Sequence, residues 1–261
     1  MFLGIIGGTG LYELLDDAEK IKFRTPYGYV ILYRGLIQDQ EIAFLPRHGV
    51  DHDRLPREVN YLGNIYTLKQ LGITRILATS AAGSFREEIK PGDFFLPDQF
   101  FGFLESDHSF RMGNVEITDP YCNEIRDAVK EAATMEKIPL HVDGIYLGYQ
   151  SYDRYETAAE IRVFKSWGMD VVGQTNHKEA ILARQLRMCY AVIIVASNYV
   201  AGISKVPLSL ENHRRVVQQS QDAMFHLVKS SIPFVTEERN CKCIEQMPEI
   251  DATALSGDLF L

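Results

Sequence analysis

The segment Phe2-Leu3-Gly4-Ile5-Ile6-Gly7-Gly8-Thr9-Gly10 opens the chain with a short apolar run that ends in a glycine-rich turn carrying one hydroxyl. The apolar run predicts a buried strand, and glycines after such a strand let an anion come close to backbone N–H groups. The segment therefore predicts a phosphate site of some kind. A tight strand-to-helix turn that binds no ligand would have the same pattern, so that alternative stays open.

The spacing of these glycines excludes two nucleotide-binding loops. A dinucleotide loop needs the pattern G-x-G-x-x-G and an acidic residue about 20 residues further on. Here Gly8-Thr9-Gly10 is followed by Leu11-Tyr12-Glu13, so the third glycine is missing. The G-x-x-x-x-G-K-[ST] pattern of a P-loop occurs nowhere in the chain. The expected ligand is therefore a smaller anion than a nucleotide.

Length and composition limit the class of protein. The 261 residues are 46% hydrophobic, and no linker, repeat or low-complexity stretch divides them, which predicts a single domain over residues 1–261. The formal charge of −8 argues against a nucleic-acid partner, which requires a basic face. No apolar run is long enough to span a membrane, and the N-terminus lacks the features of a signal peptide. We therefore expect a cytoplasmic protein.

Strand-like segments alternate with helical ones along the chain. Residues 189–196 form a continuous apolar run, as in strands that are covered on both faces. This order predicts an α/β fold with a central mixed β-sheet flanked by helices. We predict strands at 29–35, 41–46, 74–80, 93–97, 143–148, 169–173 and 188–197, and helices at 60–71, 122–135, 158–167, 178–186 and 211–230.

Polar side chains follow several of these strands at the point where each is expected to end. Ligands of such sheets gather at strand ends. Hydroxyls from separate strands, together with one arginine and one histidine, could therefore surround a tetrahedral oxyanion. Each residue alone could equally be a strand-end cap or part of a surface turn. The candidates are Thr9, Arg47, His48, Ser80, Gln174, Thr175, Ser197 and Asn198.

The four cysteines are expected to be free thiols, which is the usual state in a reducing cytosol. The pair Cys241-Lys242-Cys243 could hold a metal ion. However, no histidine lies nearby in the sequence, and a structural zinc site needs four ligands. We therefore predict no metal site. The other two cysteines are Cys122 and Cys189.

Eight segments, spread in order over nearly the whole chain, match one family. They are Ile5-Ile6-Gly7-Gly8-Thr9-Gly10, Pro46-Arg47-His48-Gly49, Val59-Asn60-Tyr61, Ser80-Ala81-Ala82-Gly83-Ser84, Pro91-Gly92-Asp93, Tyr155-Glu156-Thr157-Ala158-Ala159-Glu160, Gly168-Met169-Asp170-Val171-Val172-Gly173 and Glu179-Ala180-Ile181-Leu182-Ala183-Arg184. Through them the chain resembles the trimeric purine nucleoside phosphorylases, and most of all their methylthioadenosine phosphorylase branch. The resemblance implies cleavage of a purine nucleoside by inorganic phosphate, giving free base and ribose 1-phosphate without a metal or an organic cofactor.

The resemblance also implies roles for residues at the matching positions. Tyr155 would pack on the ribose, Gln174 would lie beside its hydroxyls, and Asn198 would face the base. The family forms trimers, sometimes doubled to hexamers, so a homotrimer or homohexamer is expected. The pairs Cys122/Cys189 and Cys241/Cys243 are similar in placement to disulfides of some archaeal relatives. Phosphate would be held by Thr9, Arg47, His48, Ser80, the backbone of Ala81, and Thr175.

Two positions bear on which purine the site accepts. The methylthioadenosine branch usually has aspartate at the position of Asn198 and again two residues later, where this chain has Val200. An asparagine amide can donate to O6 and N7 of hypoxanthine or guanine. Glu156 matches an acidic residue that accepts the N1–H of 6-oxopurines, although a carboxylate in a first helical turn is also favoured by the helix dipole. We therefore expect inosine or guanosine as substrate, with Asn198, Glu156 and His48 in the catalytic machinery.

The 5′ end of the nucleoside leaves alternatives open. His213 resembles the histidine that meets the 5′-hydroxyl in nucleoside phosphorylases, and His52 could also reach that end. An exposed histidine in a first helical turn is the other interpretation of His213. Methylthioadenosine or methylthioinosine is therefore the rival substrate, and a catalytically weakened nucleoside-binding relative is the rival class. The chain departs from the family pattern at Ser151-Tyr152-Asp153 and at Gln174, positions that bear on ribose binding.

Overall fold

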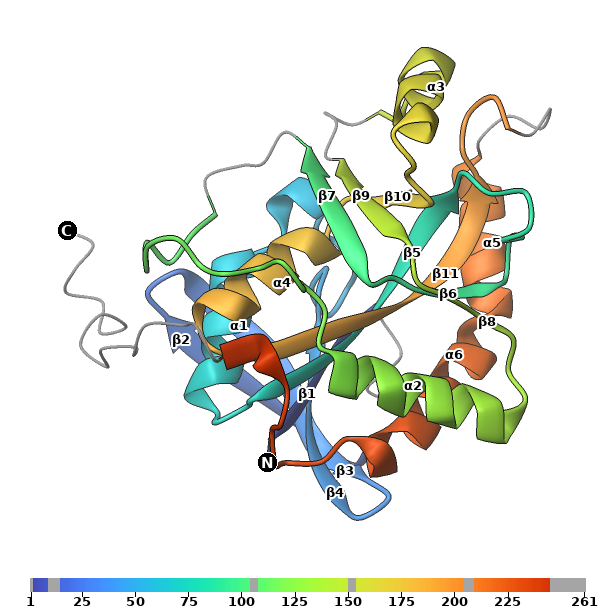
Figure 1. The fold of residues 1–261 in the computed structure, drawn as a ribbon. Coiled ribbons are helices and arrows are strands. Elements are labelled where there is room, and N and C mark those ends of the chain that lie inside the picture. The colour runs from blue at the N-terminus through green and yellow to red at the C-terminus, as the bar shows by residue number, and fades with distance from the viewer. Residues whose placement is uncertain (1, 9–14, 104–107, 150–153, 204–208, 245–261) are drawn as a thin grey trace.

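The computed structural model describes residues 2–8, 15–103, 108–149, 154–203 and 209–244 (Figure 1). Strand β1 (Leu3–Gly7) is fully buried and lies between two parallel neighbours, β4 (Gln40–Pro46) and β5 (Arg75–Ser84). This confirms the strand that the opening segment predicts. Thr9, which follows it in the expected phosphate loop, lies outside the described residues, as do residues 151–153.

The strands form one mixed sheet of 11 strands, which confirms the predicted fold class. The main path runs β2-β3-β4-β1-β5-β10-β9-β7, and β11 (Cys189–Tyr199) lies parallel to β5 on its other side. Strand β5 therefore has neighbours on both edges and organises the sheet. The remaining strands are β2 (Asp16–Thr25), β3 (Gly28–Ile37), β6 (Phe94–Leu96), β7 (Gln99–Phe103), β8 (Leu140–Val142), β9 (Ile145–Tyr149) and β10 (Val171–Gly173).

Helices cover both faces of the sheet, as the continuous apolar strands predict. Ile5 and Ile6 of β1 point to opposite faces and belong to two separate hydrophobic clusters. The cluster that contains Ile6 includes α1 and α4, and the cluster that contains Ile5 includes α2 and α6 (Figure 1). Within the described ranges, no helix has both the length and the apolar character needed to cross a membrane. The helices are α1 (Tyr61–Gln70), α2 (Asn123–Glu136), α3 (Ala158–Ser166), α4 (Asn176–Gln185), α5 (Leu210–Gln219) and α6 (Gln221–Ser231).

The predicted single helix over 211–230 is wrong, because the chain breaks into α5 and α6 at Ser220. The Ser220 hydroxyl donates to the Val216 carbonyl at 3.0 Å, a back-bond that competes with the helical hydrogen-bond pattern. Strands β2, β7 and β8 were not predicted. Strand β2 is mostly exposed and rich in charged residues, so its sequence lacks the apolar pattern that marks a strand.

A capping box fixes the start of α3. The Thr157 hydroxyl accepts from the Glu160 backbone N–H at 3.2 Å, and the Glu160 carboxylate accepts from the Thr157 N–H at 2.7 Å. The same carboxylate also pairs with Arg154. This box therefore sets the direction in which the chain enters α3, immediately after Glu156.

We expect Thr157→Ala to lower the free energy of unfolding by about 1 kcal/mol, because alanine cannot accept the N-terminal N–H of α3. Denaturant unfolding of wild type and variant measures the change. Thr157→Ser is the matched control, because it keeps the accepting oxygen and should retain most of the stability. Equal losses in the two variants would contradict a capping role.

Candidate active site

The carboxyl ends of β1 and β4 meet beside the middle of β5. In the β1–β4 register Gly7 lies opposite Pro46, and the Arg47 N–H donates to the Gly7 carbonyl at 2.9 Å. The Arg47 guanidinium reaches onward to β5, where it donates to the Thr79 carbonyl at 2.8 Å. The segments after β1 and β4 and the distal part of β5 are therefore neighbours, as expected for a ligand site at the carboxyl ends of parallel strands.

A buried ion pair anchors these strand ends to helix α4. Arg47 is 3% exposed and binds both carboxylate oxygens of Glu179 through Nε and Nη2, at 2.5 and 2.8 Å. The Tyr190 hydroxyl donates to the same carboxylate at 2.7 Å. Burial lowers the pKa of Arg47, but the attraction of Glu179 outweighs it and raises the pKa above the usual arginine range. Arg47 therefore stays charged, with that charge balanced by Glu179.

The predicted phosphate ligands Ser80 and Ala81 lie beside this pair. Both were expected just beyond a strand, but they lie inside β5, which continues to Ser84 because β10 and β11 pair with its distal part. Both residues are half-buried. The Ser80 hydroxyl is 3.4 Å from the Ala81 carbonyl, a distance at which a hydrogen bond is weak. This hydroxyl can therefore turn to another acceptor.

Thr175 lies at the N-terminus of α4, which also carries Glu179. Its side chain is buried and makes no capping hydrogen bond, while its backbone N–H donates to the Tyr146 hydroxyl at 3.2 Å. The start of a helix exposes N–H groups and the positive end of the helix dipole. Thr175 thus places a hydroxyl where an anion is favoured.

Two of the predicted histidines pack against each other with tilted rings, and a third interacts with them. The rings of His48 and His52 lie 4.8 Å apart between centroids. Burial, and then the charge of Arg47, lowers the pKa of His48 to about 4. Burial also lowers the pKa of His52 and of His213, and Arg214 lowers both further. The structure therefore brings His213 of α5 close enough to His52, in the segment after β4, for the two to interact electrostatically.

The tautomer of His48 follows from its partner. His48 Nδ1 lies 2.8 Å from the Arg54 carbonyl oxygen, which can only accept a hydrogen bond. A neutral ring must therefore carry its proton on Nδ1. The other nitrogen, Nε2, is then an acceptor and not a donor.

Asn198 lies inside β11, near its carboxyl end, and not after the strand as expected. An irregularity in the pairing between Ala196 and Asn198 sets it opposite Gly83 of β5. A Cβ at Gly83 would lie only 3.2 Å from Asn198 Nδ2, so a larger residue there would press on the amide. The amide accepts from Ser197 Oγ at 2.8 Å and donates to the Tyr199 carbonyl at 3.0 Å. Its orientation is thereby fixed, with one N–H left over.

Glu156 is a second buried carboxyl group among the predicted site residues. It is 9% exposed, and no other described side chain bonds its carboxylate. Burial, followed by the nearby charge of Glu160, raises the pKa of Glu156. Its neighbour Tyr155 is 46% exposed. The backbone N–H of Glu156 itself and the charge of Arg154 offset only part of the shift in the pKa of Glu156. A buried carboxyl group with a raised pKa is typical of a functional site.

The start of α3, two residues after Glu156, packs against the segment just after β11. A Cβ on Gly202, just beyond β11, would lie 3.3 Å from the Ala158 side chain at the start of α3. Gln174 follows β10, which pairs with β5 beside Gly83, and is half-buried. The candidate base and ribose residues therefore come from segments that border one another.

Sequence reasoning missed the role of Glu179 in this site. The segment Glu179-Ala180-Ile181-Leu182-Ala183-Arg184 matches the family pattern, but no function is predicted there for the Glu179 carboxylate. A signal was present in the sequence: Glu179 lies in the first turn of a helix whose side chains are almost all buried, and such a carboxylate needs a partner. The identity of that partner, 132 positions away, could not be inferred from spacing.

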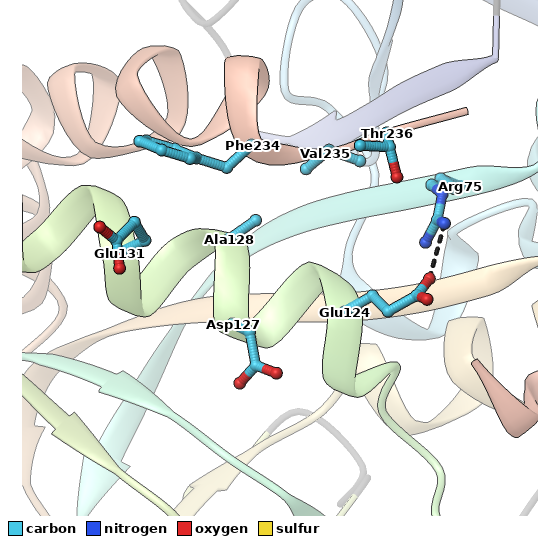
Figure 2. Close-up of a pocket in the computed structure, with 8 residues that line it drawn as sticks. All are labelled: Arg75, Glu124, Asp127, Ala128, Glu131, Phe234, Val235 and Thr236. Carbon is cyan, nitrogen blue, oxygen red and sulfur yellow. Dashed lines mark hydrogen bonds and ion pairs between the residues drawn. The ribbon is translucent and has the colours of Figure 1, made fainter. Parts of the chain in front are cut away.

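A separate cavity of about 370 Å³ lies at the other end of β5 (Figure 2). Its walls are α2, the segment 234–236 and Arg75, the first residue of β5. Figure 2 shows Arg75 pointing toward Glu124, with which it forms an ion pair at 2.6 Å. This cavity includes none of the predicted site residues. The candidate active site is therefore assigned from its side chains and its place at the carboxyl ends of the strands.

Comparison with known proteins gives a consistent result. The family model described as "Phosphorylase superfamily" matches residues 2–233. The chain is 41% identical over 258 residues to a probable 6-oxopurine nucleoside phosphorylase of Dictyoglomus turgidum, covering 95% of this chain and 97% of the relative. It is 40% identical over 254 residues to a 6-oxopurine nucleoside phosphorylase of Pyrococcus furiosus, covering 92% and 96%. A solved methylthioadenosine phosphorylase from an antarctic soil metagenomic library superposes with a TM-score of 0.88 at 28% identity, covering 97% and 94%.

We expect Glu179→Gln to lower the free energy of unfolding by about 3–5 kcal/mol, because it leaves the Arg47 charge buried without its partner. Thermal and denaturant unfolding measure the loss. Glu41→Gln is the matched control: it breaks the pair between Arg34 and Glu41, whose side chains are 47% and 42% exposed, and should change stability little. If both variants were equally stable, Glu179 would not hold the site together.

Proposed function

Because the chain belongs to the phosphorylase superfamily, we propose that it is a purine nucleoside phosphorylase acting on 6-oxopurine nucleosides such as inosine and guanosine. It cleaves the glycosidic bond with inorganic phosphate and releases the base and ribose 1-phosphate. One observation carries the choice of base: the Glu156 carboxyl group is buried, and no other described side chain forms a hydrogen bond or ion pair with it. A 6-oxopurine carries an N1–H, which can donate a hydrogen bond to this carboxylate.

Asn198 suits the leaving base. Its Oδ1 and one Nδ2–H are already engaged by Ser197 and the Tyr199 carbonyl, so the free N–H can point at N7 or O6 of a purine. The base gains negative charge as the C1′–N9 bond breaks. A fixed donor aimed at that charge stabilises the transition state more than the ground state.

The phosphate site is proposed around Arg47, Ser80, the Ala81 backbone and Thr175, with Thr9 contributing from the glycine-rich loop. Among the described residues, Arg47 uses three of its five N–H groups, which leaves two for a phosphate oxygen. The Thr175 hydroxyl, which makes no capping hydrogen bond, and the N–H groups at the N-terminus of α4 add further donors. These groups support binding of a free anion.

His48 has a different task in this proposal. Its neutral ring presents an unprotonated Nε2, which accepts hydrogen bonds. A monohydrogen phosphate carries one P–O–H, and Nε2 can accept that hydrogen. The remaining oxygens then face donors, and one of them faces C1′ of the ribose.

The reaction follows from this arrangement. As the C1′–N9 bond breaks, its electron pair moves onto the purine, where Asn198 and Glu156 hold the ring. The sugar becomes electron-poor, and a phosphate oxygen forms the new bond to C1′. Tyr155 and Gln174 are proposed to position the ribose, and His213 and His52 to meet its 5′-hydroxyl. Phosphate is the co-substrate and no organic cofactor takes part. The family resemblance supports a homotrimer or homohexamer, and the composition supports a cytoplasmic location.

The direct test is turnover of inosine, guanosine, adenosine and methylthioadenosine with and without phosphate. We expect phosphate-dependent release of hypoxanthine and guanine, at least about tenfold faster than release of adenine, because a mismatched buried polar pair costs about 1–3 kcal/mol. Adenine release alone would overturn the assignment of Glu156 and Asn198. Methylthioinosine as an added substrate tests the 5′ end, and a preference for it over inosine would contradict the role of His213.

The pH dependence of kcat/KM tests Glu156 directly. Because burial raises the pKa of Glu156, its carboxylate is lost as the pH falls through a value above the ordinary glutamate range. We expect kcat/KM for inosine to fall on the acid side with that midpoint, and Glu156→Gln to abolish this limb and lower kcat/KM above it. Since the pKa of His48 is about 4, titration of His48 should not produce a limb of the pH profile near the usual histidine pKa.

Glu237→Gln is the matched control for this measurement, because Glu237 is exposed in the C-terminal segment. It should leave the pH profile unchanged. An acid limb that persists in Glu156→Gln would show that another group accepts the proton.

A further inference from the structure

The four cysteines, far apart in sequence, meet in one buried cluster. Cys122 precedes α2, Cys189 begins β11, and Cys241 and Cys243 lie in the C-terminal segment that ends in the 3-10 helix η4 (Lys242–Ile244). Their Sγ atoms all lie within 4.8 Å of one another, and those of Cys189 and Cys241 are 3.4 Å apart. Three of the thiols are buried and Cys241 is half-buried. All four are free thiols in the structure.

These separations are those of ligands around one small ion. Zinc lies about 2.3 Å from each thiolate sulfur, so a tetrahedral site places the sulfurs roughly 3.8 Å apart. The Cys189–Cys241 distance of 3.4 Å and the upper limit of 4.8 Å for all pairs lie on either side of that value. Four sulfurs with no nitrogen or oxygen ligand favour zinc among the abundant divalent ions.

From this geometry we propose that Cys122, Cys189, Cys241 and Cys243 bind a structural zinc ion, which fastens the C-terminal segment to the sheet. Binding converts the four thiols to thiolates, so each ligand releases a proton and the site has a net charge of −2. The ion leaves no open position for a substrate, as in structural zinc sites.

A buried cation lies beside the cluster and suits that negative charge. Arg75 is 1% exposed, and its Nη1 lies 3.9 Å from Cys122 Sγ. Its Nε has no hydrogen-bond partner among the described residues. Glu124 accepts a hydrogen bond from Nη2 of the same guanidinium, as Figure 2 shows, and not from Nε. The positive end of α2, at Cys122, also favours thiolate over thiol.

A second cavity, of about 540 Å³, gives an ion access to the cluster. Besides Cys241 and Cys243, its lining includes the acidic residues Glu116, Asp119, Glu124 and Asp127 and the basic residues Arg184 and Lys242. The acidic residues outnumber the basic ones, which favours the approach of a divalent cation from solvent. The half-buried Cys241 is the ligand that such an ion would meet first.

The proposed zinc ion would also strengthen the attachment of the C-terminal segment to the rest of the fold. The segment after α6 is held to α2 by polar contacts, such as the Asn240 N–H to Glu124 at 2.8 Å. A zinc ion would add bonds from this segment to β11 and α2 at once. It lies at the amino ends of β5 and β11, roughly 30 Å along the strand from Asn198, so it should act on stability and not on substrate binding.

This proposal replaces the sequence-based prediction of no metal. That prediction treated Cys241 and Cys243 as an isolated pair with two ligands too few. The fold supplies the other two from Cys122 and Cys189, which lie 52 or more positions away from Cys241.

Titration of the reduced protein with zinc alone, against a chromophoric chelator and without oxygen, tests the site. We expect one zinc ion per chain, release of protons on binding, and a melting temperature raised by roughly 5–15 °C. Loss of a residue that only hydrogen-bonds a metal ligand weakens metal binding about 10- to 100-fold. Cys241→Ser removes a ligand itself, so it should weaken zinc binding by more than that. Lys242→Ser, an exposed position between two of the ligands, is the matched control and should bind like wild type.

Two results would overturn the proposal. One is intact mass of the freshly purified protein four hydrogens below that of the reduced chain, with no zinc bound after reduction, since the cysteines would then serve as two disulfides. The other is four reduced thiols that take up no zinc. Because Cys241 is half-buried, its serine variant should still fold, and circular dichroism checks this independently of metal content.

Discussion

The bidentate pair between Arg47 and Glu179 is the contact on which this site depends. It joins the end of β4 to α4, and through Thr79 and Tyr190 it also reaches β5 and β11. Both charges are almost completely buried, so their desolvation is repaid only while the geometry holds and the remaining donors are satisfied. A pair of this kind stabilises little by itself. It does fix how four elements meet, and those elements carry the candidate phosphate ligands.

The two ends of the central strands have different tasks. The carboxyl ends of β5 and β11 hold the polar groups proposed for chemistry, including Ser80 and Asn198. Their amino ends begin at Arg75 and Cys189, beside the four sulfurs and the C-terminal segment. Nearly every residue of these strands between the two ends is buried. The strands therefore act as rigid spacers, so the sulfur cluster can stabilise the fold without lying near the reacting groups.

Elements whose residues show a strong apolar pattern could be predicted from the sequence. Features that depend on contacts between distant parts of the chain could not. Strands such as β4 and β11 are continuous apolar runs and were predicted within a few residues. The exposed β2 has no such pattern, and the break at Ser220 depends on one side-chain hydrogen bond. In the site, residue types at strand ends suggested an anion. Glu179 as the partner of Arg47 could not be predicted, nor the meeting of the four cysteines, because both depend on tertiary contacts.

The charge balance of the site bears on how the proposed reaction would proceed. Glu179 neutralises Arg47, and the low pKa of His48 leaves its ring uncharged near neutral pH. Bound phosphate would then be held mainly by hydrogen bonds and the α4 dipole, which orient it without cancelling its charge. A dianion that keeps its charge can stabilise the electron-poor ribose that forms as the base departs. A site with several unpaired cations would bind phosphate more tightly but would weaken that effect, since only interactions that grow toward the transition state accelerate the reaction.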